Sequence, residues 1–194
     1  MIYQPDRYHA LIFDCDGTLT DSMETHYIAW RQTMSRHGID FTHERFYALA
    51  GMPTEKIIRL LSDETGTPLS VLEVAGEKEA AFLELIDHVK PFEPVFEIAS
   101  SMRGKLPMAV ASGGRRESIN AQLRRIGCEG WFDAVVTSED TERHKPHPDV
   151  FLHAARLMAV PPQGCLVYED ADLGIAAAAA AGMDCVDVRQ WMGT

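Results

Sequence analysis

Residues 9–18 read His9-Ala10-Leu11-Ile12-Phe13-Asp14-Cys15-Asp16-Gly17-Thr18, a short apolar run that ends at two carboxylates. A run of this length with an abrupt polar end predicts a buried strand over residues 9–13. Side chains two positions apart on an extended chain point the same way, so Asp14 and Asp16 are expected on one face. Ligands of open α/β sheets bind at the carboxyl ends of the strands. The ends of the other strands are therefore where a site would be completed.

The rest of the chain alternates strand-like and helix-like segments. Strands are predicted over residues 108–111, 134–137, 165–168 and 185–188. Helices are predicted over residues 94–102, 115–125, 149–158 and 172–181. Strands separated by helices of this length form parallel βαβ units whose sheet is covered on both faces. The sequence thus predicts an α/β fold with a doubly wound, Rossmann-like parallel sheet.

Residues 22–90 interrupt this alternation. They contain four helix-like segments, at residues 24–36, 43–49, 54–62 and 70–88, and no convincing strand. Met23, Tyr27, Trp30 and Met34 recur three or four positions apart and mark one apolar helix face. We predict an all-helical cap domain over residues 21–90, inserted into a core domain formed by residues 1–20 and 91–194.

Composition excludes several classes of protein. The 194 residues include 29 acidic and 18 basic side chains, for a formal net charge of −11. This charge argues against general binding to nucleic acid or to an anionic membrane. No apolar run approaches the roughly 18 residues of a membrane-spanning helix, and the start of the chain does not resemble a signal peptide. The four cysteines lack Cys-x-x-Cys spacing, which favours buried free thiols in a reducing compartment. We expect a cytoplasmic protein and a monomer.

Polar groups gather at four of the predicted strand ends. They supply carboxylates, a hydroxyl with flexible backbone, and an ammonium group: Asp14 and Asp16, Ser112-Gly113-Gly114, Lys145, and Glu169-Asp170. Such a set suits phosphoryl transfer through an aspartyl phosphate, in which one carboxylate attacks phosphorus and a second protonates the leaving alcohol and then activates water. Mg²⁺ prefers hard oxygen ligands, while lysine, hydroxyl and backbone amides bind the transferring group. The expected partner is a small phosphorylated metabolite.

Each of these groups also has a simpler interpretation. A calcium loop counted from Asp14 needs Gly at its sixth position and Glu at its twelfth, but Leu19 and Thr25 stand there, which excludes it. Ser112 and its glycines would serve equally as the cap of the next helix. Arg115 would then oppose the dipole at that helix N-terminus unless an anion is bound nearby. Lys145 could lie in a plain surface turn. Glu169 and Asp170 could simply precede a helix, where acidic residues are common.

A zinc site is a further alternative. His144, His147 and His153 supply imidazoles, but their spacing fits no common structural zinc site. The combination of all four polar groups at successive strand ends favours phosphoryl chemistry over these separate explanations.

With these groups in this order, the chain resembles the haloacid dehalogenase-like (HAD) hydrolases. The likeness spans almost the whole chain, and its motifs are Asp14-Cys15-Asp16-Gly17-Thr18, Ser112-Gly113, Lys145-Pro146-His147-Pro148-Asp149 and Glu169-Asp170. The helical insert is similar to the C1-type cap of the branch that contains β-phosphoglucomutase and small sugar phosphatases, including the fructose-1-phosphate phosphatase-like members. Dehalogenases themselves lack the second aspartate and the metal, so Asp16 favours phosphate chemistry.

The resemblance implies a role for each motif residue. Asp14 would be the nucleophile and a Mg²⁺ ligand, and Asp16 the general acid/base, ligating the metal through its backbone carbonyl. The phosphoryl group would be bound by Ser112, Gly113 and the catalytic Lys145. The remaining metal ligands would be Asp170 and Glu169, with Asp172 as an alternative because members of the family differ at this motif.

The resemblance extends to the cap. His26 corresponds to a position near the active site of the mutase-like branch, although a solvent-facing histidine is the alternative. Residues 51–54 resemble the cap loop that reaches toward substrate, and Thr54 stands where the mutase has an arginine for a second phosphate. Thr18 also matches the phosphatase pattern, whereas Arg115 occupies the place of a phosphate-binding lysine of the mutase.

These observations predict a Mg²⁺-dependent phosphatase of small sugar phosphates, of the fructose 1-phosphate or deoxyhexose phosphate type. The nearest alternative is a mutase that moves phosphate between carbons of a sugar. A more remote alternative is a receiver-type signalling module, which also phosphorylates an aspartate but needs neither Asp16 nor a cap.

Overall fold

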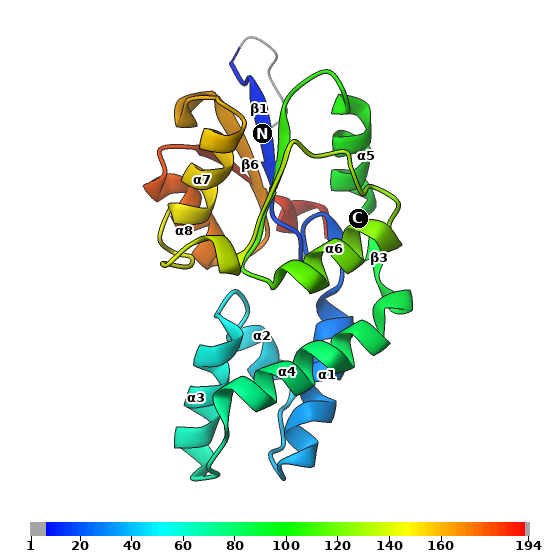
Figure 1. Ribbon diagram of the computed structural model, residues 1–194, viewed down its shortest axis with the longest axis vertical. Helices are drawn as coiled ribbons and strands as arrows, with labels where there is room; N and C mark the ends of the chain where they lie inside the picture. Colours follow the sequence, from blue (N-terminus) through cyan, green and yellow to red (C-terminus); the bar gives the residue numbers. More distant parts are fainter. Residues whose placement is uncertain (1–6, 193–194) are drawn as a thin grey trace.

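Five parallel strands form the central sheet of the computed structural model, which describes residues 7–192 (Figure 1). Their order is β5-β4-β1-β6-β7, so chain connections run outward on both sides of β1. The strands are β1 (Ala10–Phe13), β4 (Met108–Ala111), β5 (Ala134–Val136), β6 (Cys165–Glu169) and β7 (Asp184–Asp187). The predicted doubly wound parallel sheet is confirmed. Residues 1–6, which enter the signal-peptide expectation, lie outside the described residues.

Alternate side chains of each strand face two different layers of helices. Leu11 and Phe13 pack with α5 (Glu93–Met102) and α6 (Arg116–Arg125) on one face. Ala10 and Ile12 pack with α7 (Asp149–Leu157) and α8 (Asp172–Ala180) on the other (Figure 1). Both faces of the sheet are therefore covered, which explains why β1, β4 and β5 are apolar throughout and not alternating.

Four helices form a unit of their own beyond the carboxyl ends of the strands (Figure 1). They are α1 (Met23–Arg36), α2 (His43–Ala48), α3 (Thr54–Thr65) and α4 (Val71–Glu84). A separate apolar cluster that includes Trp30, Met34, Phe41 and Ile58 holds them together. The chain enters and leaves this helical unit through an antiparallel ribbon of β2 (Thr20–Asp21) and β3 (Lys90–Pro91). The domain boundaries at residues 21 and 90 stay a prediction that this arrangement supports.

The structure differs from the predicted elements mainly at their ends. The helix expected over residues 70–88 ends at Glu84 and is followed by the 3₁₀ turn Ile86–His88. The last strand begins one residue earlier than expected, and Val188, expected as its final residue, begins the 3₁₀ helix Val188–Trp191. The Asp187 carboxylate accepts a hydrogen bond from the Arg189 backbone N–H, and this cap starts the turn. The remaining 3₁₀ turns are Ser138–Asp140 and Pro162–Gly164.

The cysteines carry free thiols. Cys15, Cys128 and Cys165 are buried, and Cys185 is half-buried. Burial raises the pKa of Cys165 to about 11 and that of Cys128 to about 12. Within residues 7–192, no helix is both long and apolar enough to cross a bilayer.

Candidate active site

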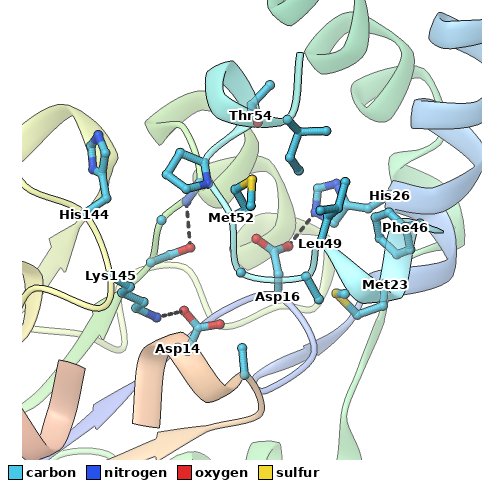
Figure 2. Close-up of a pocket in the computed structure, with 18 of the residues that line it drawn as sticks. Asp14, Asp16, Met23, His26, Phe46, Leu49, Met52, Thr54, His144 and Lys145 are labelled. Atoms are coloured by element: carbon cyan, nitrogen blue, oxygen red, sulfur yellow. Dashed lines mark hydrogen bonds and ion pairs between the residues drawn. The ribbon is translucent and has the colours of Figure 1, made fainter. Parts of the chain in front are cut away.

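A cavity lies between the carboxyl ends of the strands and the helical unit, and it contains most of the predicted site (Figure 2). The sheet contributes Asp14 after β1, Ser112 after β4 and Glu169 at the end of β6, while Lys145 lies in the loop before α7. The opposite wall comes from α1, α3, α4 and the loop before α3. The two parts of the chain therefore enclose the motif residues between them.

Lys145 contacts two carboxylates at the base of this cavity. Its Nζ donates to Asp14 Oδ1 at 2.5 Å and to Glu169 Oε2 at 2.7 Å, and all three side chains are buried. Burial and the negative charge of Glu169 raise the pKa of Asp14 to about 8. Burial lowers the pKa of Lys145, but the charges of Asp14 and Glu169 outweigh it and raise the pKa overall. The ammonium group is thus held charged next to a nucleophile candidate.

Three carboxylates meet closely enough to share one cation. Ligand oxygens of Asp14, Glu169 and Asp170 lie within 4.8 Å of one another. Burial and the charge of Asp14 raise the pKa of Asp170 to about 7, although Thr18 Oγ1 donates a hydrogen bond to it at 2.8 Å. The single positive charge of Lys145 cannot neutralise the negative charges of three carboxylates. Carboxylate oxygens are also the hard ligands that Mg²⁺ prefers. The residues present therefore fit a divalent metal ion.

Asp16 lies in a different environment from Asp14. Three donors reach the same oxygen, Oδ1: Ser22 Oγ at 2.8 Å, His26 Nε2 at 2.7 Å and Gln122 Nε2 at 2.8 Å. Burial raises the pKa of Asp16, but His26 and these hydrogen bonds outweigh it and lower the pKa overall. The other oxygen points away from His26 into the cavity (Figure 2). Two carboxylates two residues apart are thus driven toward opposite protonation states, a pattern typical of acid–base pairs.

His26 is part of a buried chain of polar contacts. Lys78 Nζ lies 3.1 Å from His26 Nδ1, and an ammonium group can only donate. His26 Nδ1 therefore accepts, and Nε2 donates to Asp16. His26 also stacks on Phe82, with the ring centroids 3.8 Å apart. The structure places this histidine in the cavity wall and not on a solvent-facing helix surface.

The loop after β4 presents a small, open backbone surface. Ser112 Oγ accepts a hydrogen bond from the Gly114 N–H at 3.0 Å. A side chain at Gly113 would meet nothing within 4 Å, so a ligand has room to approach this backbone. Ser112, Gly113 and Lys145 all line the cavity, which agrees with their expected use as phosphate-binding groups.

Two of the sequence-based candidates lie apart from this cluster. The side chain of Asp172 is 86% exposed and accepts a hydrogen bond from Arg189 Nη1 at 2.8 Å, so it turns away from the three carboxylates. Arg115 is not among the described cavity-lining residues, and it pairs with Glu55 of α3 at 3.3 Å. Thr54 lines the cavity as expected. Of the three histidines considered for a zinc site, His144 is among the described residues that line the cavity, whereas His147 and His153 are not.

The sequence interpretation missed four residues that complete the site. Ser22 and Gln122 hold Asp16, while Lys78 and Glu79 of α4 line the cavity. Lys78 carried a signal, because it falls in the apolar face of α4, four positions from both Val74 and Phe82. A lysine in an apolar helix stripe needs a partner, which a binding site supplies.

Gly174 gives the Glu169 carboxylate its room. A Cβ at position 174 would lie 2.0 Å from the Glu169 carboxyl carbon. Gly174→Ala should therefore displace Glu169 from Lys145, destabilise the fold by about 1–3 kcal/mol, and lower activity by about tenfold or more. The matched control is Gly76→Ala, also inside a helix, where the new methyl group meets nothing within 4 Å. Thermal melting and phosphate release measure both effects, and equal behaviour of the two variants would contradict this packing argument.

Acid should weaken metal binding. A metal ion needs its carboxylates deprotonated, and the raised pKa values of Asp14 (about 8) and Asp170 (about 7) mean that protons compete for them. We expect the apparent affinity for Mg²⁺ to fall about 10- to 100-fold from about pH 8 to about pH 6. Calorimetric titration in two buffers with different ionisation enthalpies would also detect the released protons. Equal affinity at both pH values, without proton release, would refute the expectation.

Comparison with known proteins identifies the class. A family model of haloacid dehalogenase-like hydrolases matches residues 8–182, and the chain belongs to this family. The chain is 42% identical over 185 residues to the fructose-1-phosphate phosphatase YqaB of Escherichia coli, covering 95% of this chain and 98% of that protein. It is 30% identical over 188 residues to the β-phosphoglucomutase of Bacillus subtilis, covering 93% of this chain and 83% of that protein.

The fold agrees with solved structures. A crystal structure of CbbY from Rhodobacter sphaeroides in complex with phosphate has a TM-score of 0.85 at 24% identity, over 92% of this chain and 84% of that one. The family model and the relative at 42% identity confirm the predicted membership in the HAD hydrolases. The family, together with the phosphatases among the relatives, supports the predicted class of phosphoric monoester hydrolase.

Proposed function

We propose that this protein is a Mg²⁺-dependent phosphatase of small sugar phosphates, of the fructose 1-phosphate type, that works through a phosphorylated Asp14. The observation that carries the proposal is the cluster of Asp14, Glu169 and Asp170 around Lys145 at the base of the cavity. The similarity to a fructose-1-phosphate phosphatase supports the choice of substrate. Residues 21–90 serve as the cap that covers the leaving group. A cytoplasmic location and a monomeric state stay predictions.

The first step is attack by Asp14 on phosphorus. A new bond forms between a carboxylate oxygen and phosphorus, and the bond from phosphorus to the sugar oxygen breaks. Asp16 must first take up a proton at Oδ2, which faces the cavity, and it then gives that proton to the departing oxygen. Lys145, Ser112 and the Gly113 backbone bind the phosphoryl oxygens during this transfer. Mg²⁺ held by Asp14, Asp170 and Glu169 would offset the negative charge that gathers there.

The second step regenerates the enzyme. Asp16, now deprotonated, takes a proton from water, and the water oxygen attacks phosphorus while the bond to Asp14 breaks. Inorganic phosphate leaves. The lowered pKa of Asp16 keeps it in the deprotonated form that accepts this proton, and the hydrogen bond that His26 Nε2 donates to Oδ1 orients the carboxylate.

A substrate panel tests the proposal. Phosphate release is measured with hexose, pentose and deoxyhexose phosphates, with Mg²⁺ and with a chelator. We expect turnover that depends on Mg²⁺, with fructose 1-phosphate among the best substrates. Absence of phosphate release from every monoester would overturn the proposal. Multiple turnovers would also separate this enzyme from a receiver-type module, in which a phospho-aspartate persists.

A sugar phosphate mutase is the second candidate, because a β-phosphoglucomutase is among the relatives. A mutase must hold the second phosphate of a bisphosphate intermediate. The structure offers less for this purpose: Thr54 carries no charge, and Arg115 is paired with Glu55. Incubation with β-glucose 1-phosphate and a bisphosphate primer decides between them, since only a mutase accumulates glucose 6-phosphate.

A further inference from the structure

Glu79 is a carboxylate in the cavity wall that the chemistry above does not use. It lies on α4, on the side of the helical unit where the leaving group of a phosphate ester would sit, and its side chain is 13% exposed. Lys78 Nζ donates to its Oε1 at 3.1 Å, and Ser118 Oγ of α6 donates to its Oε2. These two contacts fix the carboxylate between the helical unit and the sheet.

The contacts also keep Glu79 charged. Burial raises its pKa, but the adjacent Lys78 and the hydrogen bond from Ser118 outweigh burial and lower the pKa overall. A carboxylate has about four acceptor positions and no donor when it is ionised. Two donors leave positions for hydroxyl groups of a bound molecule.

The positive charges around the cavity are already paired. Among the described residues that line it, the lysines are Lys78 and Lys145, and no arginine is present. Lys145 contacts Asp14 and Glu169, whereas Lys78 contacts Glu79 and His26. Among the described lining residues, every lysine is therefore already paired with a carboxylate, and no unpaired lysine or arginine is there to bind a second anionic group.

We propose that Glu79 is a specificity-determining residue that restricts the leaving group to a neutral, polyhydroxylated molecule and excludes one with a second phosphate or a carboxylate. The inference rests on the proposed phosphatase function. The fixed carboxylate accepts hydrogen bonds from sugar hydroxyls, and its charge offsets that of Lys78, so this wall offers a second anionic group no net positive charge. Rejection of a competitor by an unfavourable charge is a common source of specificity.

Two pairs of substrates test this proposal. In the first pair, glycerol 1-phosphate has a hydroxymethyl group where 3-phosphoglycerate has a carboxylate. In the second pair, fructose 1,6-bisphosphate has a second phosphate that fructose 1-phosphate lacks. The wild-type protein should prefer the neutral member of each pair in kcat/KM by about tenfold or more. Equal kcat/KM values within both pairs would overturn the inference without any variant being made.

Glu79→Gln removes the charge and leaves Lys78 unpaired. We expect the preference for the neutral member to fall by about tenfold or more in both pairs, mainly through a lower KM for the anionic member. Glu79→Asp keeps the charge and should keep the preference. The matched control is Glu77→Gln on the same helix, because Glu77 is outside the cavity lining and pairs with His37 at 3.0 Å. It should leave both ratios unchanged.

The outcomes are separable from those of the proposed function. If the wild type hydrolyses no monoester, the proposed function fails. If it hydrolyses fructose 1-phosphate but a folded Glu79→Gln protein, checked by circular dichroism, keeps the wild-type preference, this inference alone fails. A shift of the same size in Glu77→Gln would also overturn it, because the effect would then follow net charge and not the cavity.

Discussion

Asp14→Asn should abolish turnover, with kcat falling by about a thousandfold or more. An amide is a much weaker nucleophile than a carboxylate, so the bond to phosphorus is not formed. The substitution also removes one of the three carboxylates that lie within 4.8 Å of one another, which should weaken Mg²⁺ binding. Phosphate release from fructose 1-phosphate measures the loss. Mass spectrometry after acid quenching should find a phosphorylated Asp14 in the wild type and none in the variant.

Loss of activity here should not come from unfolding. Burial raises the pKa of Asp14 to about 8, so the charged form is unfavourable in the folded state near neutral pH. A neutral asparagine removes this cost while Lys145 keeps its contact with Glu169 at 2.7 Å. We expect a melting temperature at or above that of the wild type. Asp63→Asn, at an exposed position of α3, is the control and should change neither property. Near-native turnover in Asp14→Asn would refute the covalent mechanism.

The strand-end residues were predictable because strand geometry places them. Consecutive parallel strands end at one edge of a sheet, so Asp14, Ser112 and Glu169 meet there although they are far apart in the chain. The apolar runs before them identify the strands without any tertiary information. Strand geometry does not predict the position of the Asp172 side chain. Asp172 begins α8, and its carboxylate turns outward to Arg189.

Residues of the helical unit were harder to predict. Glu79 lies on α4, and which face of that helix meets the other domain depends on packing; only its neighbour Lys78, in the apolar stripe, carried a local signal. Gln122 lies on α6 of the core and reaches Asp16 only through tertiary packing. The ribbon of β2 and β3 was missed because each strand has two residues and pairs across about 70 positions of chain. The pairing of Arg115 with Glu55 likewise follows from how α3 approaches the sheet.

Asp16→Asn should slow the reaction in a way that depends on the leaving group. With a sugar phosphate, kcat should fall by about 10²–10⁴-fold because the departing alkoxide has no proton donor. With p-nitrophenyl phosphate the leaving group needs no proton, so Asp14 should still be phosphorylated. Water activation in the second step remains impaired. Stopped-flow absorbance should therefore show a burst of about one equivalent of nitrophenol, followed by slow turnover.

The burst separates the roles of the two aspartates. An asparagine at position 16 keeps an oxygen for the hydrogen bonds that Ser22, His26 and Gln122 now donate to Oδ1, so the local structure should persist. Asp14→Asn should give no burst with the same ester, since it lacks the group that receives the phosphoryl. Asp172→Asn is the matched control within the motifs and should behave as the wild type, because its side chain is 86% exposed. A slow Asp16→Asn reaction without a burst would mean that Asp16 is already needed for attack on phosphorus, and its assignment as the acid and base of the two steps would be wrong.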